Sequence, residues 1–476
     1  MTTLIAFVIV YLLASIVIGL YAARKVKTTA DYALAGRSLP MPVIIATTFA
    51  TWFGAETVLG VSATFAKDGL RGVVEDPFGS SMCLVLVGLF FAAKLYRMNL
   101  MTIGDYYKLR YGRAVEMITS IVIVLSYMGW VAAQIKALGL VFNLLAPEFM
   151  SVQAGMVLGT AIVLGYTVFG GMFSVAMTDF FQMIVIAVGL IIIAVLAANA
   201  AGGAGVVWQA AASKDLLTFL PKPEAKEMIA FAAAAVTLML GSIPQQDVFQ
   251  RVMSSKNEKI ATRGPIIGGL LYLLFAFIPM FVVIAALKVT PEVSAGLLEK
   301  DAQQILPTFI MGNMPLFAQV MFFGALLSAI MSTASATILA PSTTIVENII
   351  KPFFPSLSDK AMLKTLRVTV LVFTAAVLVF ALQSSDSIYE MVKNAYKVTL
   401  VGAFVPLVMG LYWKRANTAG ALLSIVAGVG VWLLGEFTFN EVFPAQLAGL
   451  GAAFVGMVLG SLLWGKTLTR GNNKND

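Results

Sequence analysis

Apolar residues occur in long runs separated by short stretches that contain charges, Gly and Pro. Each run can cross a bilayer core of about 30 Å, which takes roughly 20 helical residues. The pattern predicts thirteen membrane-spanning helices, at 3–23, 42–66, 75–96, 114–145, 150–169, 173–199, 228–250, 264–288, 315–347, 362–383, 388–412, 417–438 and 445–465. The longest connection, 200–227, is too short for a soluble domain, so residues 1–476 are predicted to form one all-α membrane domain.

Lys and Arg are unevenly distributed between the two sets of loops. The side of the loops after odd-numbered predicted spans, counted with the adjoining span ends and the C-terminal tail, holds 22 of them, and the other side holds 7. The positive-inside rule assigns the richer side to the cytoplasm. We therefore predict an integral plasma (inner) membrane protein with its N-terminus outside and its C-terminus, including Lys466, Arg470 and Lys474, in the cytoplasm. The first span, 3–23, has no small-residue cleavage pattern and is predicted to be a retained helix.

Composition narrows the classes of function. Hydrophobic residues make up 59 % of the chain and charged residues 12 %, against roughly 25 % charged in soluble domains. The chain has no His and one Cys, Cys83, which excludes a His-bearing zinc site, a Ser-His-Asp triad and an internal disulfide. A phosphate-binding loop of the GxxxxGK[ST] type is absent. We expect no enzyme activity, no catalytic residues, no organic cofactor and no nucleic-acid partner.

Two predicted spans are interrupted by residues that unwind helices. The second contains Phe53-Gly54 at its middle, and the seventh contains Gly241-Ser242-Ile243-Pro244 toward its end. Unwound backbone inside a bilayer is tolerated only beside protein or a water-filled cavity. The two spans are five helices apart, which is the spacing of the first helices of two inverted five-helix repeats with a site between them. The alternative is that Gly and Pro are simply common in membrane helices.

Hydroxyl groups cluster in the ninth predicted span, where Ser332, Thr333 and Ser335 lie within one helical turn. Hydroxyl and carbonyl oxygens suit a hard cation such as Na⁺. The alternative is helix packing, since small residues let helices approach and hydroxyls can bond to their own helix. Asp179, near the predicted cytoplasmic start of the sixth span, fits cation coordination or an ion exit path, and alternatively an interfacial charge.

Glu56 follows the break in the second span and has apolar neighbours. A cationic solute, a proton or a metal cation would stabilise it there, and so would a structural salt bridge to Lys136, Lys393 or Lys397. Trp52 and Trp130 lie inside spans, away from the interfacial aromatic belts. They could stack on an apolar or quaternary ammonium group, or simply pack in the core.

Several stretches resemble the sodium:solute symporter family. They are Asp31-Tyr32-Ala33-Leu34-Ala35-Gly36-Arg37-Ser38-Leu39, Tyr166-Thr167-Val168-Phe169-Gly170-Gly171-Met172-Phe173-Ser174 with Thr178-Asp179, and Ser328-Ala329-Ile330-Met331-Ser332-Thr333. The resemblance runs from about Asp31 to Lys414-Arg415. It implies a five-plus-five inverted repeat of the leucine-transporter type, with 3–23 before it, repeats at 42–199 and 228–412, and two helices at 417–465 after it.

The family resemblance also implies an ion site. Its main sodium ligands match the carbonyls of Ala50 and Phe53 in the broken helix, and Ala329, Ser332 and Thr333 on the later helix. Some members hold a second sodium ion with the acid that matches Asp179 and with further hydroxyls. Ser335 retains one of these hydroxyls here, while the next position is Ala336.

Local motifs look most like the choline-transporter branch, which holds a quaternary ammonium in an aromatic box. Two box positions match as Trp52 and Trp130, but Ser80 and Gln245 stand where the branch has tyrosine and tryptophan. Replacing rings with hydrogen-bonding groups favours a solute more polar than choline. Choline is therefore not inferred as the solute.

These observations predict a sodium-coupled symporter that imports a small polar organic solute and functions as a monomer. The predicted solute pocket comprises Trp52, Glu56, Ser80, Trp130 and Gln245. The acid favours an amine or zwitterion, such as an amino acid or a betaine-like compound. The alternatives are a symporter for a monocarboxylate or another solute, or a membrane sensor or sodium-leak channel on the same scaffold.

Overall fold

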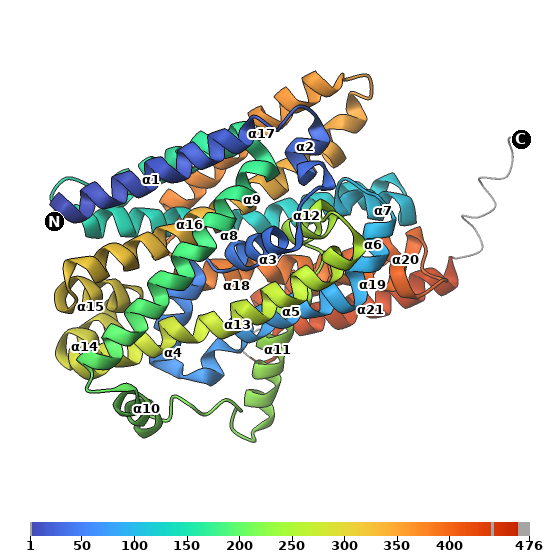
Figure 1. Cartoon of the computed structure of the whole chain (residues 1–476). Helices are drawn as coiled ribbons and strands as arrows, with labels where there is room; N and C mark the ends of the chain where they lie inside the picture. Colours follow the sequence, from blue (N-terminus) through green and yellow to red (C-terminus); the bar gives the residue numbers. More distant parts are fainter. Residues whose placement is uncertain (1, 439–441, 465–476) are drawn as a thin grey trace, which may run out of the picture.

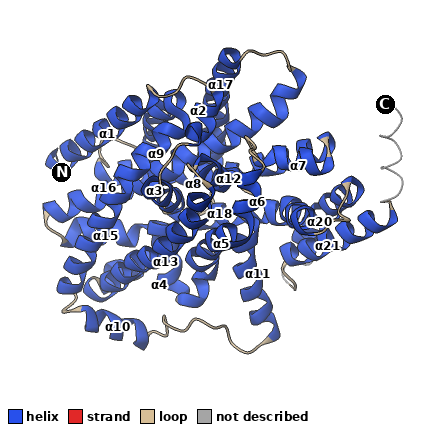
Figure 2. Cartoon of the chain, turned by 45° about the vertical axis from the view of Figure 1, so that its right-hand side comes forward, coloured by secondary structure: helices blue, strands red, loops and turns tan. Residues whose placement is uncertain are grey.

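The computed structural model describes residues 2–438 and 442–464. Within these ranges the chain is helical and contains no strand (Figure 2), apart from one isolated backbone pairing between Leu39 and Ser255. The predicted cytoplasmic tail residues Lys466, Arg470 and Lys474 lie outside the described ranges.

The helices and short helical segments are α1 (Thr2–Ala23), α2 (Thr29–Leu34), η1 (Ala35–Arg37), α3 (Met41–Trp52), η2 (Glu56–Val61), α4 (Ser62–Asp68), η3 (Leu70–Val73), η4 (Val74–Gly79), α5 (Ser80–Leu86), η5 (Val87–Phe91), α6 (Ala92–Arg97), α7 (Ile103–Tyr111), α8 (Arg113–Leu145), α9 (Val152–Ala200), α10 (Ala204–Ser213), α11 (Ala225–Gly241), α12 (Gln246–Ser254), α13 (Glu258–Val289), α14 (Pro291–Lys300), η6 (Ala302–Gln304), α15 (Ile305–Asn313), α16 (Leu316–Thr344), η7 (Ile345–Ile350), η8 (Lys351–Phe353), α17 (Asp359–Gln383), α18 (Ile388–Thr399), η9 (Leu400–Phe404), α19 (Val405–Tyr412), α20 (Thr418–Thr438) and α21 (Ala445–Leu463). Figure 1 shows their arrangement.

Ten helical segments in the described ranges are long and apolar enough to span a membrane, and two bent pairs bring the number to as many as twelve. The count is lower than the thirteen predicted spans because α9 counts once, although it joins two helices, over 150–169 and 173–199, across a kink. This helix kinks at Gly171, whose φ of 49° suits glycine and where a Cβ would lie 2.3 Å from the Tyr32 carbonyl oxygen.

The two arms of α9 run in opposite directions along α1. In the first arm, Tyr166 packs against Gly19 near the end of α1. In the second arm, Ser174 donates a hydrogen bond to the Gly19 carbonyl, and the later Phe181 stacks on the earlier Tyr11. The chain therefore turns back at the kink, which is the path expected of two crossings. The count of thirteen stays a prediction.

Both of the predicted helix breaks are present in the structure. α3 ends at Trp52, and the chain bends by 54° before continuing as η2 and α4. α11 ends at Gly241 and bends by 45° into α12, across a connection that contains Pro244. Gly and Pro explain both interruptions, because they release the helical ladder of hydrogen bonds.

The centre of the molecule is occupied by α16. Every residue from Ala325 to Thr344 is buried, as expected of a helix that is surrounded by other helices. The second arm of α9 and helix α8 pack against it, and α3 reaches it through its broken end. Ions and solutes that reach the break in α3 would therefore be enclosed by protein and not by lipid.

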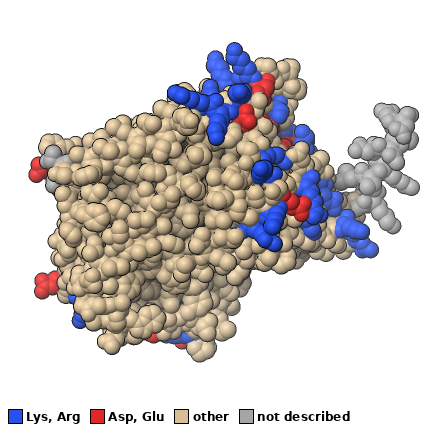
Figure 3. Space-filling model, in the orientation of Figure 1, with Lys and Arg blue, Asp and Glu red and all other residues tan. Residues whose placement is uncertain are grey.

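Basic side chains gather at one end of the molecule. Figure 3 shows most of the visible Lys and Arg over the region where α2, α7 and α17 lie in Figure 1. At this basic end, the Leu39 amide donates to the Ser254 carbonyl at 3.0 Å, and the Lys256 amide donates to the Leu39 carbonyl at 3.0 Å. These bonds join the start of α3 to the end of α12, so the two broken helices are fastened together there.

Candidate functional site

The residues predicted to bind sodium come from the broken end of α3 and the middle of α16. Thr333 Oγ1 donates to the Ala50 carbonyl oxygen at 3.4 Å, which brings the two elements together. Phe53 has non-helical backbone angles, with φ of −87° and ψ of 72°. All five predicted ligands are buried, the other two being Ala329 and Ser332. The arrangement offers oxygen groups without a fixed charge, which suits reversible binding of Na⁺.

Asp179 lies beside this group and not at an interface. It is fully buried on the second arm of α9 and accepts hydrogen bonds from Ser332 Oγ at 2.6 Å and from the Thr47 hydroxyl. An exposed interfacial charge, the alternative for this residue, does not fit these contacts. Ser335 does not bond to Asp179 in the structure, because its hydroxyl donates to the Ser332 carbonyl at 3.0 Å.

Glu56 is held by two donors from α8. Trp130 Nε1 donates to Glu56 Oε1 at 3.0 Å, and Gln134 Nε2 donates to Oε2 at 2.6 Å. Gln134 is fixed in turn, because its Oε1 accepts from the Ala55 amide at 3.0 Å. The carboxylate is 3 % exposed, so it is buried in a defined orientation.

The proposed salt-bridge partners of Glu56 have other contacts. The Lys136 ammonium donates to the Asp386 carbonyl at 2.5 Å. Lys393 lies 3.7 Å from Glu390, and Lys397 lies 3.2 Å from Glu436. The salt-bridge alternative for Glu56 is therefore wrong for this structure.

Gly54 lies between Glu56 and the predicted ion ligands, close to both. A Cβ at this position would lie 2.5 Å from Glu56 Oε2 and 2.6 Å from Thr333 Oγ1. Both oxygens thus face the same point at the break in α3. This contact places an acidic group directly beside the proposed sodium site.

An aromatic cluster adjoins Glu56. The Trp52 and Trp130 rings meet edge to face with centroids 5.6 Å apart. Tyr396 of α18 stacks on Trp52 at 6.1 Å and tilts against Trp130 at 5.5 Å. The Tyr396 hydroxyl is buried and lacks a hydrogen-bond partner among the described residues. Sequence reasoning missed Tyr396 and Gln134, which are distant in the chain from the break and belong to no motif there.

The two remaining predicted pocket residues, Gln245 and Ser80, are also buried. Gln245 Nε2 donates to Ser126 Oγ at 2.9 Å and to Thr399 Oγ1 at 3.4 Å, so its amide is used within the protein. Ser80 is buried at the start of α5, directly after η4, which holds two further acids. The structure brings Trp52, Glu56 and Trp130 together.

Sequence reasoning also missed the acids Glu75 and Asp76. Both are 2 % exposed and line a narrow cavity that is too small to hold a water molecule. The complete lining is Glu56, Glu75, Asp76, Leu238, Tyr389, Val392 and Lys393. The predicted span 75–96 begins at these acids, and the structure has a break there, since Asp76 has non-helical backbone angles with φ of −138° and ψ of 120°.

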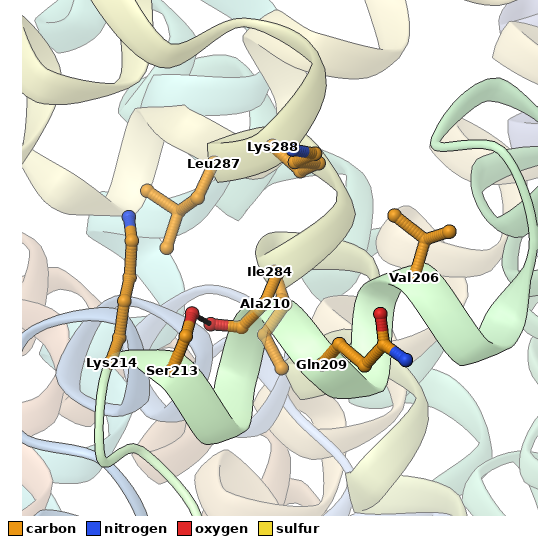
Figure 4. A pocket seen from close by; sticks show the side chains of 8 residues that line it. All are labelled: Val206, Gln209, Ala210, Ser213, Lys214, Ile284, Leu287 and Lys288. Carbon is orange, nitrogen blue, oxygen red and sulfur yellow. Dashed lines mark hydrogen bonds between the residues drawn. The ribbon is translucent and has the colours of Figure 1, made fainter.

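Two other hollows lie outside the predicted site. One opens at the end of the molecule that carries α4 and α14, and it shares Tyr389 and Lys393 with the narrow cavity. Figure 4 shows another, between α10 and the end of α13, where Lys214 and Lys288 are among the lining residues. None of the predicted site residues lines the hollow of Figure 4.

Comparison with known proteins agrees with this architecture. The chain is 28% identical over 93% of its length to the high affinity choline transporter 1 of Homo sapiens, covering 78% of that protein. It is 27% identical to the high-affinity proline transporter PutP of Bacillus subtilis, with 93% of this chain and 95% of that protein covered. The sodium/pantothenate symporter of Escherichia coli is 26% identical, with coverage of 95% and 96%.

A solved structure shares the fold. A Na⁺-coupled sialic acid symporter in a substrate-bound outward-open state matches with a TM-score of 0.81 and 20% identity, over 96% of this chain and 98% of that one. The all-helical fold is therefore of the leucine-transporter type. The model of the sodium:solute symporter family matches residues 32–428. From this match over most of the chain, together with the shared fold, we conclude that the protein belongs to the sodium:solute symporter family.

Proposed function

We propose that this symporter imports an amine or a zwitterion together with Na⁺. The observation that carries the proposal is the buried Glu56 carboxylate. It accepts hydrogen bonds from Trp130 and Gln134, but it forms no ion pair with any of the described residues. An uncompensated charge at membrane depth is costly unless a cation joins it. Trp52 and Trp130 add ring faces that attract an ammonium group.

The ion and the solute would meet at Gly54. We assign Na⁺ to the oxygens of Ala50, Phe53, Ala329, Ser332 and Thr333. Thr333 faces the same point as Glu56, so occupancy of one site changes the electrostatic field of the other. Asp179 would orient Ser332 or add a second cation site.

Access to the pocket would alternate between the two ends of the molecule. Tyr389 and Lys393 lie between the open hollow and the narrow cavity, and the Tyr389 hydroxyl donates to the Gly72 carbonyl at 3.4 Å. The backbone hydrogen bond between Leu39 and Ser254 holds the two broken helices together at the basic end. We assign the basic end to the cytoplasm, with the N-terminus outside, and we propose that one chain performs the cycle.

The test is uptake into proteoliposomes, with and without an inward sodium gradient. Choline, betaine, amino acids, aliphatic amines and monocarboxylates are compared as labelled solutes and as competitors. We expect accumulation of an amine or zwitterion above equilibrium only with the gradient.

Two results would contradict the proposal. Solute entry that only equilibrates would indicate a channel, because a channel does not concentrate its solute. Inhibition by simple monocarboxylates, with none by amines or zwitterions, would overturn the charge argument for Glu56.

A further inference from the structure

The first helix, α1, reaches the helix that carries the proposed sodium ligands. The Tyr11 hydroxyl lies 2.6 Å from Ser328 Oγ, and this contact ties α1 to α16. Ser328 Oγ donates to the Gly324 carbonyl, also at 2.6 Å. A serine hydroxyl has a single hydrogen to donate. Tyr11 is therefore the donor in the bond between the two helices.

Ser328 lies next to the proposed ligands. It precedes Ala329 directly and lies one helical turn before Ser332. Ser328 and Met331 share one face of α16, because residues three or four positions apart are neighbours on a helix surface. The proposed ligands Ala329, Ser332 and Thr333 lie on the adjoining face. Bonds that fix the first face therefore also fix the direction in which the ligands point.

A second tyrosine holds the same face of α16. Tyr166, in the first arm of α9, is fully buried and donates to the Met331 carbonyl at 3.1 Å. Tyr166 packs in turn on α1, where a Cβ at Gly19 would lie 2.7 Å from Tyr166 Cβ. The Ser174 hydroxyl of the second arm donates to the Gly19 carbonyl. Helix α1 thus bonds to α16 directly through Tyr11 and supports it indirectly through both arms of α9.

Both tyrosines bond to groups other than the proposed ligands. Tyr11 bonds to the Ser328 hydroxyl, and Tyr166 bonds to the Met331 carbonyl. Any effect of these bonds on the ion therefore acts through the position of α16. Ligands that are held in place before the ion arrives bind it more tightly, because less order has to be created on binding. Loss of such outer contacts weakens metal sites even when every ligand is kept.

We propose that Tyr11 and Tyr166 are positioning residues for Na⁺, so that α1 supports the ion site. This inference rests on the proposed assignment of Na⁺ to the ligands on α16. It gives a role in ion binding to the helix that precedes the two repeats.

The test measures sodium affinity in the absence of solute. The full chain in proteoliposomes is titrated with NaCl on both sides of the membrane, while KCl keeps the ionic strength constant. Thermal stabilisation by Na⁺ gives the half-saturating concentration. Tyr11→Phe and Tyr166→Phe remove only the hydroxyl groups. Each should raise the half-saturating sodium concentration by about fivefold, since one hydrogen bond of ordinary strength is lost.

Two further variants separate positioning from a general effect on α1. Tyr21→Phe is the matched control, because Tyr21 is on the same helix and is 67 % exposed. It should keep the wild-type sodium affinity. Ser328→Ala removes the acceptor of the Tyr11 hydroxyl. In that background Tyr11→Phe should have little further effect, because the bond is already absent.

The outcomes are distinguishable. Weaker sodium binding in both tyrosine variants, with Tyr21→Phe unchanged, supports the positioning role. A lower unfolding temperature without sodium, combined with unchanged sodium affinity, makes the tyrosines purely structural and overturns it. An equal effect of Tyr11→Phe with and without Ser328 overturns the role of their bond, and an effect of Tyr166→Phe alone overturns the role of α1.

The ion site itself is tested in the same titration. If Ser332→Ala with Thr333→Ala weakens sodium binding and the tyrosine variants do not, this inference fails and the proposed ion site stands. If the double variant binds sodium as the wild type does, the proposed ion site fails and this inference fails with it.

Discussion

The two broken helices bend in a similar way, but different side chains surround the two bends. The chain bends by 54° between α3 and η2, and by 45° between α11 and α12. At the first break, Glu56 and Thr333 face Gly54 with an acidic and a hydroxyl oxygen. At the second break, Gln245 is bonded to Ser126 and Thr399.

The two breaks differ in how their polar groups are arranged. At the first break, the Glu56 carboxylate and the Thr333 hydroxyl converge on Gly54. At the second break, the Gln245 amide bonds to protein, while Ser242 Oγ and Asp247 Oδ2 are buried without a partner among the described residues. Asp247 near the second break accepts from the Tyr127 hydroxyl, and the Asp247 amide donates to that hydroxyl at 2.8 Å. Arg251 Nη2 donates to Thr51 Oγ1 at 2.7 Å, which links α12 to α3. Similar bends in the two helices therefore do not imply that the two breaks have the same function.

The most severe test of this comparison is Gly54→Ala. The added methyl group would lie within 2.6 Å of both Glu56 Oε2 and Thr333 Oγ1, and it would separate them. We expect loss of most sodium-driven uptake in proteoliposomes. Gly205→Ala on α10, where nothing lies within 4 Å of the added group, is the control and should transport normally. Normal uptake by Gly54→Ala would show that this contact does not link the sites.

Removing two proposed ion ligands is the next test. Ser332→Ala with Thr333→Ala should raise the sodium concentration for half-maximal uptake by tenfold or more, since two bonds of roughly 1–1.5 kcal/mol each are lost. Ser342→Ala on the same helix removes a hydroxyl that bonds only to its own backbone, at Ile338. It should leave sodium dependence unchanged. Equal sodium dependence in the folded double variant and the wild type would exclude these ligands.

Glu56→Gln tests the charge at the first break. The amide retains the shape but loses the negative charge, so amine affinity should fall by about tenfold. The affinity for a neutral solute of similar size should change much less. Competition of labelled uptake measures both. An unaltered solute preference would make Glu56 a structural residue.

Gln245→Leu should have the smallest effect on solute binding. It leaves Ser126 and Thr399 with unsatisfied bonding capacity, so thermal stability should fall, by about 1–3 kcal/mol of unfolding free energy. Solute affinity should change by less than about threefold, because the amide bonds to protein. A loss of affinity comparable to that of Glu56→Gln would place Gln245 in the pocket and remove the contrast between the breaks.

Local sequence signals predicted the features that depend on local physics. Gly and Pro predicted both breaks, and apolar runs predicted the helices around them. The hydroxyl run of α16 is also a local signal. The resemblance to the family, and not a local signal, implied Ala50 and Phe53 as its partners, and the structure brings Ala50 and Thr333 together.

Features that depend on tertiary contacts were not predictable in this way. Tyr396 reaches the tryptophans from α18, far away in the sequence, and Gln134 reaches Glu56 from α8, one turn after Trp130. Glu75 and Asp76 lie at a break, where Asp76 has non-helical backbone angles, and only the fold buries them. Similarly, the contact of Gly171 with Tyr32, at which the chain turns back, depends on the fold and not on the apolar runs on either side.

The backbone hydrogen bonds that join the two broken helices at the basic end affect how this protein tolerates substitution. They join main-chain groups of Leu39, Ser254 and Lys256, so exchange of their side chains leaves the donors and acceptors in place. Only a change that removes an amide hydrogen, such as Lys256→Pro, deletes a bond outright. The contact between the two broken helices at this end is thus insensitive to exchange of these side chains, whereas the contacts around Glu56 depend on side chains and change with them.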